Sequence, residues 1–293
     1  MSYGNIEVHT PSSREEAVKL LAEKGPEVRI VAGGTEVMVE LRDGIIRQNA
    51  FMDISKLQEL RYVRTGDDGL IHIGALTTLS NCLSNSTLAD NAPILVDAIR
   101  NMASVQVRNV GTIGGNIANA SPAGDTIPPL YVQTGKVVLS SVHGERMVNI
   151  EEFFLGPNIT VAKPYEMITE IQVKPMLPYE KGFFKRISLR RAHACSVASV
   201  ACWLKKEEND LVRDVRIALG AVSPTVIRAR GAEKSLKDGH LTKERLWPIS
   251  EEAALECMPI ADVRASIEYR RSAIAALTYR GLLETLEINQ ENT

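Results

Sequence analysis

Two short glycine-rich segments, far apart in the sequence, place the strongest constraint on this chain. The first is Ala32-Gly33-Gly34-Thr35-Glu36, which follows an apolar stretch, and the second is Gly111-Thr112-Ile113-Gly114-Gly115-Asn116. Adjacent glycines leave backbone N–H groups uncovered, so such a segment can close around an anionic oxygen. Two segments of this kind predict that one diphosphate group is held from both sides.

Neither segment matches the two commonest nucleotide-binding motifs. A phosphate-binding loop of the G-x-x-x-x-G-K-[ST] type needs a lysine, and no lysine follows either glycine segment. The G-x-G-x-x-G fingerprint that opens a long helix is also missing. We therefore expect neither a nucleoside triphosphatase nor a Rossmann-type NAD domain.

The composition is that of an ordinary globular protein with 293 residues and a net charge of -2, which gives no reason to expect a nucleic acid or an anionic membrane as partner. No apolar run reaches the roughly 20 residues that span a bilayer. The first residues lack the pattern of a signal peptide, so we expect a cytoplasmic protein. The cysteines form no C-x-x-C pair and the histidines no cluster, which predicts structural, reduced thiols and no metal site.

The hydrophobic pattern predicts an α+β chain with mixed sheets rather than a regular doubly wound fold. Residues 13–16 have the sequence of a capping box that opens a helix, and Gly25-Pro26 closes it. The pattern after Val37 leaves a strand or a short helix open. Prolines at 175 and 178 mark a linker. Strands are expected over residues 28–31, 52–54, 70–74, 136–140, 147–150, 196–204 and 211–222, turns at 67–69, 143–144 and 209–210, and helices over 93–102 and 272–287.

The second glycine segment and the residues before it carry a specific resemblance. Gln106-Val107-Arg108-Asn109-Val110-Gly111-Thr112-Ile113-Gly114-Gly115-Asn116 resembles the signature of the FAD-binding subunits of molybdenum hydroxylases, the family of xanthine, carbon monoxide and nicotinate dehydrogenases. Ile30-Val31-Ala32-Gly33-Gly34-Thr35-Glu36-Val37 resembles the first FAD loop of that family. The stretches 153–157 and 166–171 agree with the family in order and spacing, so the resemblance covers nearly the whole chain.

The resemblance implies a fold with two domains. Residues 1–176 would form an FAD-binding domain of the p-cresol methylhydroxylase type, with two α+β lobes at about 1–58 and 59–176. Residues 177–293 would form a smaller α+β domain that resembles the carbon monoxide dehydrogenase flavoprotein C-terminal domain.

The resemblance also implies which residues hold FAD. Both glycine segments would surround the diphosphate and the adjoining ribityl or ribose group. Asp125 would contact a hydroxyl of the cofactor, Ile168 would supply an apolar contact, and Lys185 would lie at the flavin. The implied cofactor-binding residues are Ile30, Val31, Ala32, Gly33, Gly34, Thr35, Glu36, Val37, Thr112, Ile113, Gly114, Gly115, Asn116, Asp125, Ile168 and Lys185.

Three further residues match positions that vary in the family. Met102 stands where some relatives carry an aromatic residue. His193 and Cys195 lie in a stretch where relatives often carry an aspartate beside the flavin ring. This departure leaves the role of His193 and Cys195 open, and with it the details of the electron acceptor.

The function that the resemblance implies is electron transfer within a xanthine dehydrogenase-like enzyme. The chain would collect electrons from [2Fe–2S] clusters on a small partner subunit and pass them to NAD+ or another acceptor. A large molybdopterin-binding subunit would hydroxylate a purine or another N-heteroaromatic compound, in a dimer of heterotrimers. No catalytic residue is expected on this chain. Two alternatives remain: a stand-alone flavin oxidoreductase of the same fold, and a flavin-free scaffold subunit.

Overall fold

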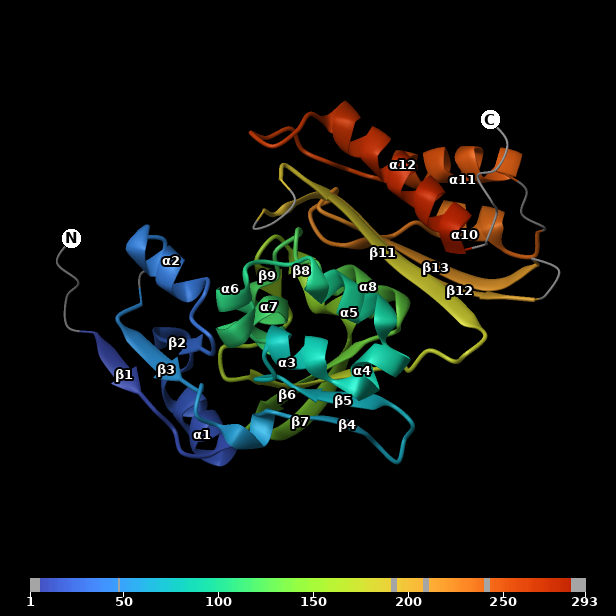
Figure 1. The fold of residues 1–293 in the computed structure, drawn as a ribbon. Coiled ribbons are helices and arrows are strands. Elements are labelled where there is room, and N and C mark those ends of the chain that lie inside the picture. The colour runs from blue at the N-terminus through green and yellow to red at the C-terminus, as the bar shows by residue number, and fades with distance from the viewer. Residues whose placement is uncertain (1–5, 47, 191–193, 208–210, 240–242, 286–293) are drawn as a thin grey trace.

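The computed structural model describes residues 6–46, 48–190, 194–207, 211–239 and 243–285. The chain forms a small N-terminal lobe, a larger second lobe and a C-terminal domain (Figure 1). Each of these three parts contains helices and its own main sheet, so the predicted α+β class is confirmed.

The N-terminal lobe is built on a parallel sheet with the strand order β1-β3-β2. Its core is formed by apolar residues of α1, which pack against the sheet and against Leu57 and Leu60. The segment that the sequence left undecided is helical and forms α2. The elements are β1 (Glu7–His9), α1 (Arg14–Lys24), η1 (Gly25–Glu27), β2 (Val28–Val31), α2 (Val37–Arg42), β3 (Ala50–Asp53) and η2 (Gln58–Leu60).

The start of α1 differs in one bond from the predicted capping box. The Ser13 hydroxyl accepts a hydrogen bond from the backbone N–H of Glu16 at 3.2 Å, as predicted. The Glu16 carboxylate, however, accepts from the backbone N–H and the hydroxyl of Ser12, each at 2.7 Å. The return bond is therefore made one residue before the helix cap, where it still fixes the chain entering the helix.

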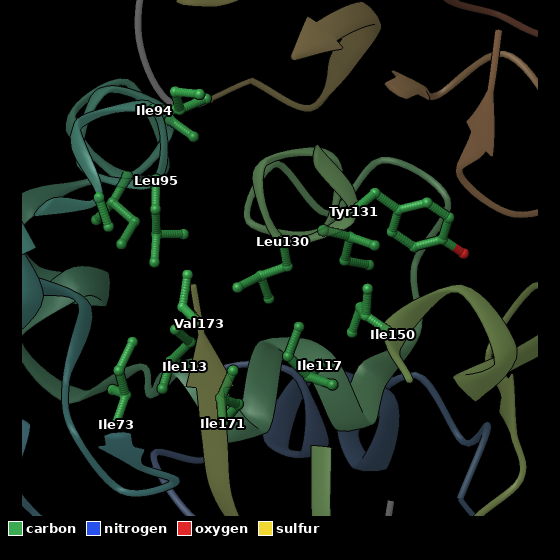
Figure 2. Packing of buried hydrophobic residues seen from close by; sticks show 14 of the residues in the cluster. Ile73, Ile94, Leu95, Ile113, Ile117, Leu130, Tyr131, Ile150, Ile171 and Val173 are labelled. Carbon is green, nitrogen blue, oxygen red and sulfur yellow. The ribbon is translucent and has the colours of Figure 1, made fainter. Parts of the chain in front are cut away.

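The second lobe is built on an antiparallel sheet with the order β4-β5-β10-β6-β7. Figure 2 shows Ile171 and Val173 of the central strand β10 in one apolar cluster with Ile113 and Ile117 of α7 and Leu130 of α8. The strands are β4 (Val63–Thr65), β5 (Ile71–Gly74), β6 (Lys136–Ser141), β7 (Gly144–Asn149) and β10 (Met167–Val173), with a short hairpin of β8 (Phe154–Gly156) and β9 (Ile159–Thr160). The helices are α3 (Leu79–Ser84), α4 (Ser86–Asn91), α5 (Pro93–Arg100), α6 (Val105–Val110), α7 (Ile113–Asn119), α8 (Ile127–Val132) and α9 (Ile150–Phe153).

The C-terminal domain is an antiparallel sheet, β11-β12-β13-β14, with helices α10, α11 and α12 on one side (Figure 1). Both faces of β12 are covered. Ala201 and Trp203 join the core of the second lobe, whereas Val200 and Cys202 pack with the three helices. Double coverage explains why this strand is continuously apolar instead of alternating. The elements are β11 (Glu180–Ser188), β12 (Ser196–Lys206), β13 (Val212–Gly220), β14 (Ile227–Arg228), α10 (Arg230–Leu236), α11 (Lys243–Leu255) and α12 (Ile267–Thr285).

Helix α12 begins at Ile267, earlier than the predicted start at residue 272. Its first turns contain Arg270, a buried charge that interrupts the apolar periodicity. The Arg270 guanidinium donates to the backbone carbonyls of Val197 and Ala221 at 2.7 and 2.8 Å and to Asp262 at 2.7 Å. These bonds provide partners for both terminal nitrogens, whereas the buried Nε atom has none among the described residues. The turn predicted at 209–210 and the helix end predicted at 287 lie outside the described residues.

The C-terminal domain and the second lobe share one hydrophobic core. The linker predicted between the prolines lies in residues 174–179, which form neither helix nor strand. On its far side, Phe184 of β11 and Ala218 of β13 belong to the same cluster as α5 and α8. The backbone N–H of Ala221 donates to the carbonyl of Pro122 at 2.8 Å across this contact. The sheet is therefore held in a fixed position beside the second lobe.

Gly182 lies where β11 packs closely against α5. A Cβ atom at this position would lie 2.4 Å from the Ile94 Cδ1 atom and 2.5 Å from the backbone carbonyl oxygen of Cys202. We expect Gly182→Ala to lower the free energy of unfolding by about 1–3 kcal/mol, because overpacking forces side chains or backbone to shift. Urea denaturation measures this. As a control, a Cβ at Gly156 meets only Ile159 at 3.8 Å, so Gly156→Ala changes stability by less than about 0.5 kcal/mol.

A histidine on β5, the strand between β4 and β10 in the second-lobe sheet, lies between two carboxylates. His72 on β5 approaches the Glu170 carboxylate with Nδ1 at 2.9 Å and the Asp68 carboxylate with Nε2 at 3.0 Å. Burial lowers the pKa of His72, but the bonds to Asp68 and Glu170 outweigh it and raise this pKa above its ordinary value. The charged imidazole is therefore favoured in the folded chain.

This raised pKa predicts a stability difference that depends on pH. A protonated His72 gains its two partners only in the folded state, so its contribution is full below the unfolded pKa of about 6.5 and is lost as the pH rises through the folded value. We expect the stability lost in His72→Gln to be larger at pH 6 than at pH 8 in urea denaturation. His143→Gln, on the exposed turn between β6 and β7, serves as the control. An equal loss at both pH values for His72→Gln would contradict this role.

Candidate cofactor-binding site

A cavity of about 930 Å³ lies where the two lobes and the C-terminal domain meet. Its lining includes the loop after β2, the segment from α5 to α7, the loop before β10, Arg186 of β11, and Ala194 and Cys195 just before β12. This volume lies in the upper part of the range found for small-molecule and cofactor sites. The residues of the lining come from sequence positions that are far apart, so only the folded chain forms the cavity.

The first glycine segment lines this cavity, and its backbone donors are free in the part of the chain that the structure describes. Within the described part of the chain, the backbone N–H groups of residues 33–37 donate to no protein acceptor. Gly33 is required by close packing, because a Cβ there would lie 2.0 Å from the carbonyl oxygen of Val110. Gly34 has a φ of 68°, in the left-handed region that favours glycine. The segment therefore forms a donor-rich wall with little side chain in front of it.

The second glycine segment is different from what the sequence suggested, because its backbone donors are already used. The residues after Thr112 begin helix α7, and Thr112 is its N-cap. The N–H groups of Ile113 and Gly114 donate to the carbonyls of Thr77 and Ala75 at 3.0 and 2.9 Å, and Gly115 donates to the Thr112 hydroxyl at 3.0 Å. This corrects the expectation that both segments offer free donors. The absence of a side chain at Gly114 instead allows close packing against Ala75.

Arg108 lies in the signature segment and makes its bonds to the chain just before it. Its guanidinium donates to the backbone carbonyls of Met102 and Ala103 at 2.6 and 3.0 Å. Ala103 has a φ of 44°, so these bonds hold a strained turn between α5 and α6. Met102, Ala103 and Ser104 line the cavity. Arg108 therefore shapes the wall of the cavity from behind.

Asp125 is a buried carboxylate on the cavity wall, with a side chain that is 4% exposed. It forms an ion pair with Arg186 of β11, and its Oδ1 atom accepts from the Ser196 hydroxyl at 2.6 Å. Burial raises the pKa of this carboxyl above its ordinary value, and the Arg186 charge and the Ser196 hydroxyl oppose this rise without cancelling it. Sequence reasoning found Asp125 and missed both of its partners.

Lys185 does not reach the cavity lining. Alternate side chains of a strand point to opposite faces, and Phe184 of β11 joins the second-lobe core whereas Phe183 packs toward α12. Lys185 lies on the same face of β11 as Phe183, and its Nζ atom is 2.5 Å from the Glu284 carboxylate of α12. Its neighbour Arg186 lines the cavity in its place. A contact between Lys185 and a cofactor stays a prediction.

The loop before β10 forms another part of the cavity wall. Arg146 binds the Glu166 carboxylate in a two-point ion pair, with distances of 2.6 and 2.8 Å. The side-chain bonds from Arg146 hold the pKa of Glu166 below its ordinary value, although burial raises it. The backbone N–H of Lys163 donates to the same carboxylate at 2.8 Å. Lys163 and the predicted residue Ile168 both line the cavity beside this fixed loop.

Most of the predicted site residues are gathered in this one place. Val31, Ile113 and Lys185 are the ones that do not line the cavity. Cys195 is exposed and lines it, whereas Cys82, Cys202 and Cys257 are buried free thiols, as expected for structural cysteines. His193 lies outside the described residues. The predicted residues in the lining are Ile30, Ala32, Gly33, Gly34, Thr35, Glu36, Val37, Thr112, Gly114, Gly115, Asn116, Asp125 and Ile168.

The described residues offer neither a metal site nor a membrane span. In that part of the chain, no three histidine, cysteine or acidic side chains gather in a group that could hold a metal ion. No described helix combines the length and the apolar character needed to cross a bilayer.

Comparison with known proteins assigns the family. Residues 4–176 match the FAD binding domain in molybdopterin dehydrogenase, and residues 183–285 match the CO dehydrogenase flavoprotein C-terminal domain. The chain belongs to the FAD-binding medium subunits of the molybdenum hydroxylases. It is thus part of an oxidoreductase family, and FAD is its cofactor.

Named medium subunits are similar over nearly their whole length. The glyceraldehyde dehydrogenase medium chain of Sulfolobus acidocaldarius is 35% identical, with 93% of this chain and 95% of the relative covered. The xanthine dehydrogenase FAD-binding subunit of Escherichia coli O157:H7 is 29% identical, with 95% of each covered. A solved carbon monoxide dehydrogenase from Hydrogenophaga pseudoflava superposes with a TM-score of 0.93 at 28% identity, covering 98% of this chain and 99% of that chain.

The residues of the cavity fit FAD by their chemistry. The free N–H groups of residues 33–37 suit a diphosphate, because an anion accepts several backbone donors at once. The Asp125 carboxylate suits a hydroxyl or another donor group of the cofactor. Ile54, Leu76 and Ile168 line the cavity and supply apolar surface for ring systems. The cavity of this chain thus suits the cofactor of its family.

Gly33 offers a test of this cavity. We expect Gly33→Ala to weaken FAD binding by at least tenfold, because the new Cβ forces the donor segment away from Val110. The measurement is the dissociation constant of FAD, from the change in flavin fluorescence on adding the deflavinated chain. Gly44→Ala is the control: Gly44 has a positive φ of 72°, unlike Gly33, but no atom lies within 4 Å of its Cβ position and it lies outside the cavity. Comparable weakening in both variants would contradict a specific role of Gly33.

Proposed function

We propose that this chain is the electron-transfer subunit of a molybdenum hydroxylase, which takes electrons from [2Fe–2S] clusters on a partner subunit and delivers them to NAD+ or another acceptor. The supporting observation is the 930 Å³ cavity lined by residues 33–37, whose backbone donors are free within the described residues, in a chain that matches a medium subunit over 93% of its length. Bound FAD supplies the chemistry that exchanges electrons singly or in pairs. No acid–base pair on this chain is needed for that task.

The residues of the chain would bind and orient the cofactor. Residues 33–37 would donate backbone hydrogen bonds to the diphosphate, and the buried Asp125 would accept a bond from a hydroxyl group. The Ile168 side chain would pack against the cofactor. The role implied for Lys185 would require that its side chain leave Glu284.

The proposed partners are a large molybdopterin-binding subunit and a small [2Fe–2S] subunit, arranged as a dimer of heterotrimers. The relatives support this because they are named medium chains, a term that implies larger and smaller chains beside them. A purine or N-heteroaromatic substrate stays a prediction. The names of the relatives include glyceraldehyde, xanthine and carbon monoxide dehydrogenases, so similar medium subunits serve enzymes with different substrates. The cytoplasmic location also stays a prediction.

The two alternatives have less support. A stand-alone flavin enzyme needs its own substrate domain, whereas the C-terminal domain here matches the flavoprotein C-terminal domain of carbon monoxide dehydrogenase. A flavin-free scaffold would have no need to retain the tight packing at Gly33 or the donors beside it.

The deciding experiment isolates the tagged chain from its native host under non-denaturing conditions and measures FAD, iron and molybdenum per chain. We expect about one FAD, with iron and molybdenum in stoichiometric amounts on two co-purifying polypeptides, and absorbance bleaching when substrate is added. Restoration of the absorbance by NAD+, compared with a quinone, identifies the acceptor. FAD without iron or molybdenum would favour the stand-alone enzyme, and absence of FAD would favour the scaffold.

A further inference from the structure

Arg186 is a buried charge at the junction of the two domains. Its side chain is 8% exposed, lies on β11 of the C-terminal domain, and lines the cavity. The same face of β11 carries Phe184, which packs into the core of the second lobe. The packing of the sheet therefore fixes the direction in which Arg186 points. A charge buried this deeply needs close partners, because its desolvation is costly.

The Arg186 guanidinium satisfies four acceptors with its two terminal nitrogens. Nη1 donates to Asp125 and to the Ser196 hydroxyl, the latter at 3.5 Å. Nη2 donates to the carbonyl of Ala194 at 3.1 Å and to the Ser188 hydroxyl at 3.5 Å. A planar guanidinium can hold such a set in one geometry, whereas a lysine ammonium reaches fewer of these acceptors.

Asp125 retains capacity for one more kind of partner. An ionised carboxylate has about four lone-pair positions and can only accept. In the described chain Arg186 and Ser196 are its partners, one at each oxygen. Because Asp125 lines the cavity, a ligand atom that faces its remaining lone pairs must be a donor. A phosphate is excluded at this point by charge repulsion.

We propose that Arg186 is a positioning residue for FAD: from the C-terminal domain it pairs with the Asp125 carboxylate and orients it so that its free lone pairs receive a donor group of the cofactor. This rests on the proposed cofactor site. It assigns a second task to the C-terminal domain, which completes the cavity and also orients a residue in the neighbouring domain. FAD affinity and the docking of the two domains are then linked.

Arg228 provides a matched control. Its side chain is also 8% exposed and also crosses the domain boundary, with Nη1 at 2.9 Å from Glu151 of α9. It differs in that neither Arg228 nor Glu151 lines the cavity. Loss of Arg228 therefore reports the effect of removing a buried arginine between the domains without touching the carboxylate of Asp125.

The test measures the dissociation constant of FAD for the full-length chain by flavin fluorescence. Arg186→Met should raise it at least tenfold at pH 7, Arg186→Lys by a smaller factor, and Arg228→Met by less than twofold. In the Asp125→Asn background, Arg186→Met should add less than twofold, because the group that it positions is gone. A role in packing alone would give the same factor in both backgrounds.

The pH profile gives an independent readout. Arg186 lowers the pKa of Asp125 against the effect of burial, so its removal leaves more of the carboxyl protonated as the pH falls. From pH 8 to pH 6, the dissociation constant should rise more steeply in Arg186→Met than in the wild-type chain, and the Asp125→Asn variants should lack this difference.

The outcomes separate the two proposals. If the wild-type chain fails to bind FAD, the proposed cofactor site is wrong. If the wild type binds and Arg186→Met binds equally well, or if Arg228→Met loses as much affinity, only the role of Arg186 is overturned. Should Arg186→Met fail to fold, Arg186→Lys takes its place in the same comparison. Arg186→Lys should then raise the dissociation constant of FAD in the wild-type background and have no further effect in the Asp125→Asn background. An equal rise in both backgrounds would overturn the positioning role of Arg186.

Discussion

The structure depends on the double packing of the C-terminal sheet. One face of β11, β12 and β13 lies against α5 and α8, and the other face lies against α10, α11 and α12. Burial of apolar surface on both sides gives this sheet a single position. Because Arg186 of β11 and the two residues just before β12, Ala194 and Cys195, line the cavity, the same packing fixes this part of the site.

The cavity joins two kinds of wall with different physical properties. On one side, residues 33–37 offer backbone donors that have no acceptor among the described residues, and Gly33 lies in close contact with the carbonyl of Val110. On the other side, the Asp125 carboxylate is held by Arg186 and Ser196. These two walls suit a ligand that has an anionic centre and separate hydrogen-bond donor groups. A dinucleotide has both.

Sequence reasoning was most successful where local pattern and family signature coincide. The strand over 28–31 and the turn at the glycines after it could be predicted from local sequence, because the chain turns there and glycine has no side chain to obstruct the turn. It was less successful where neighbours in space decide the outcome. The segment Gly114-Gly115 was expected to offer free donors, yet Ala75 and Thr112 already occupy them. The sequence could not show that Arg186 rather than Lys185 faces the cavity, because the adjacent residues Phe183 and Phe184 make both faces of β11 equally apolar.

The fold class, the family and most of the segments that build the cofactor site follow from the sequence alone, because glycine pairs, apolar periodicity and motif order are properties of the chain. Three features arise only when the chain is folded: which backbone donors stay free, which of two adjacent cations reaches the cavity, and which charge holds Asp125. Those features depend on atoms brought together from distant positions, and on burial, which changes the cost of a charge and the pKa of a carboxyl according to what surrounds it.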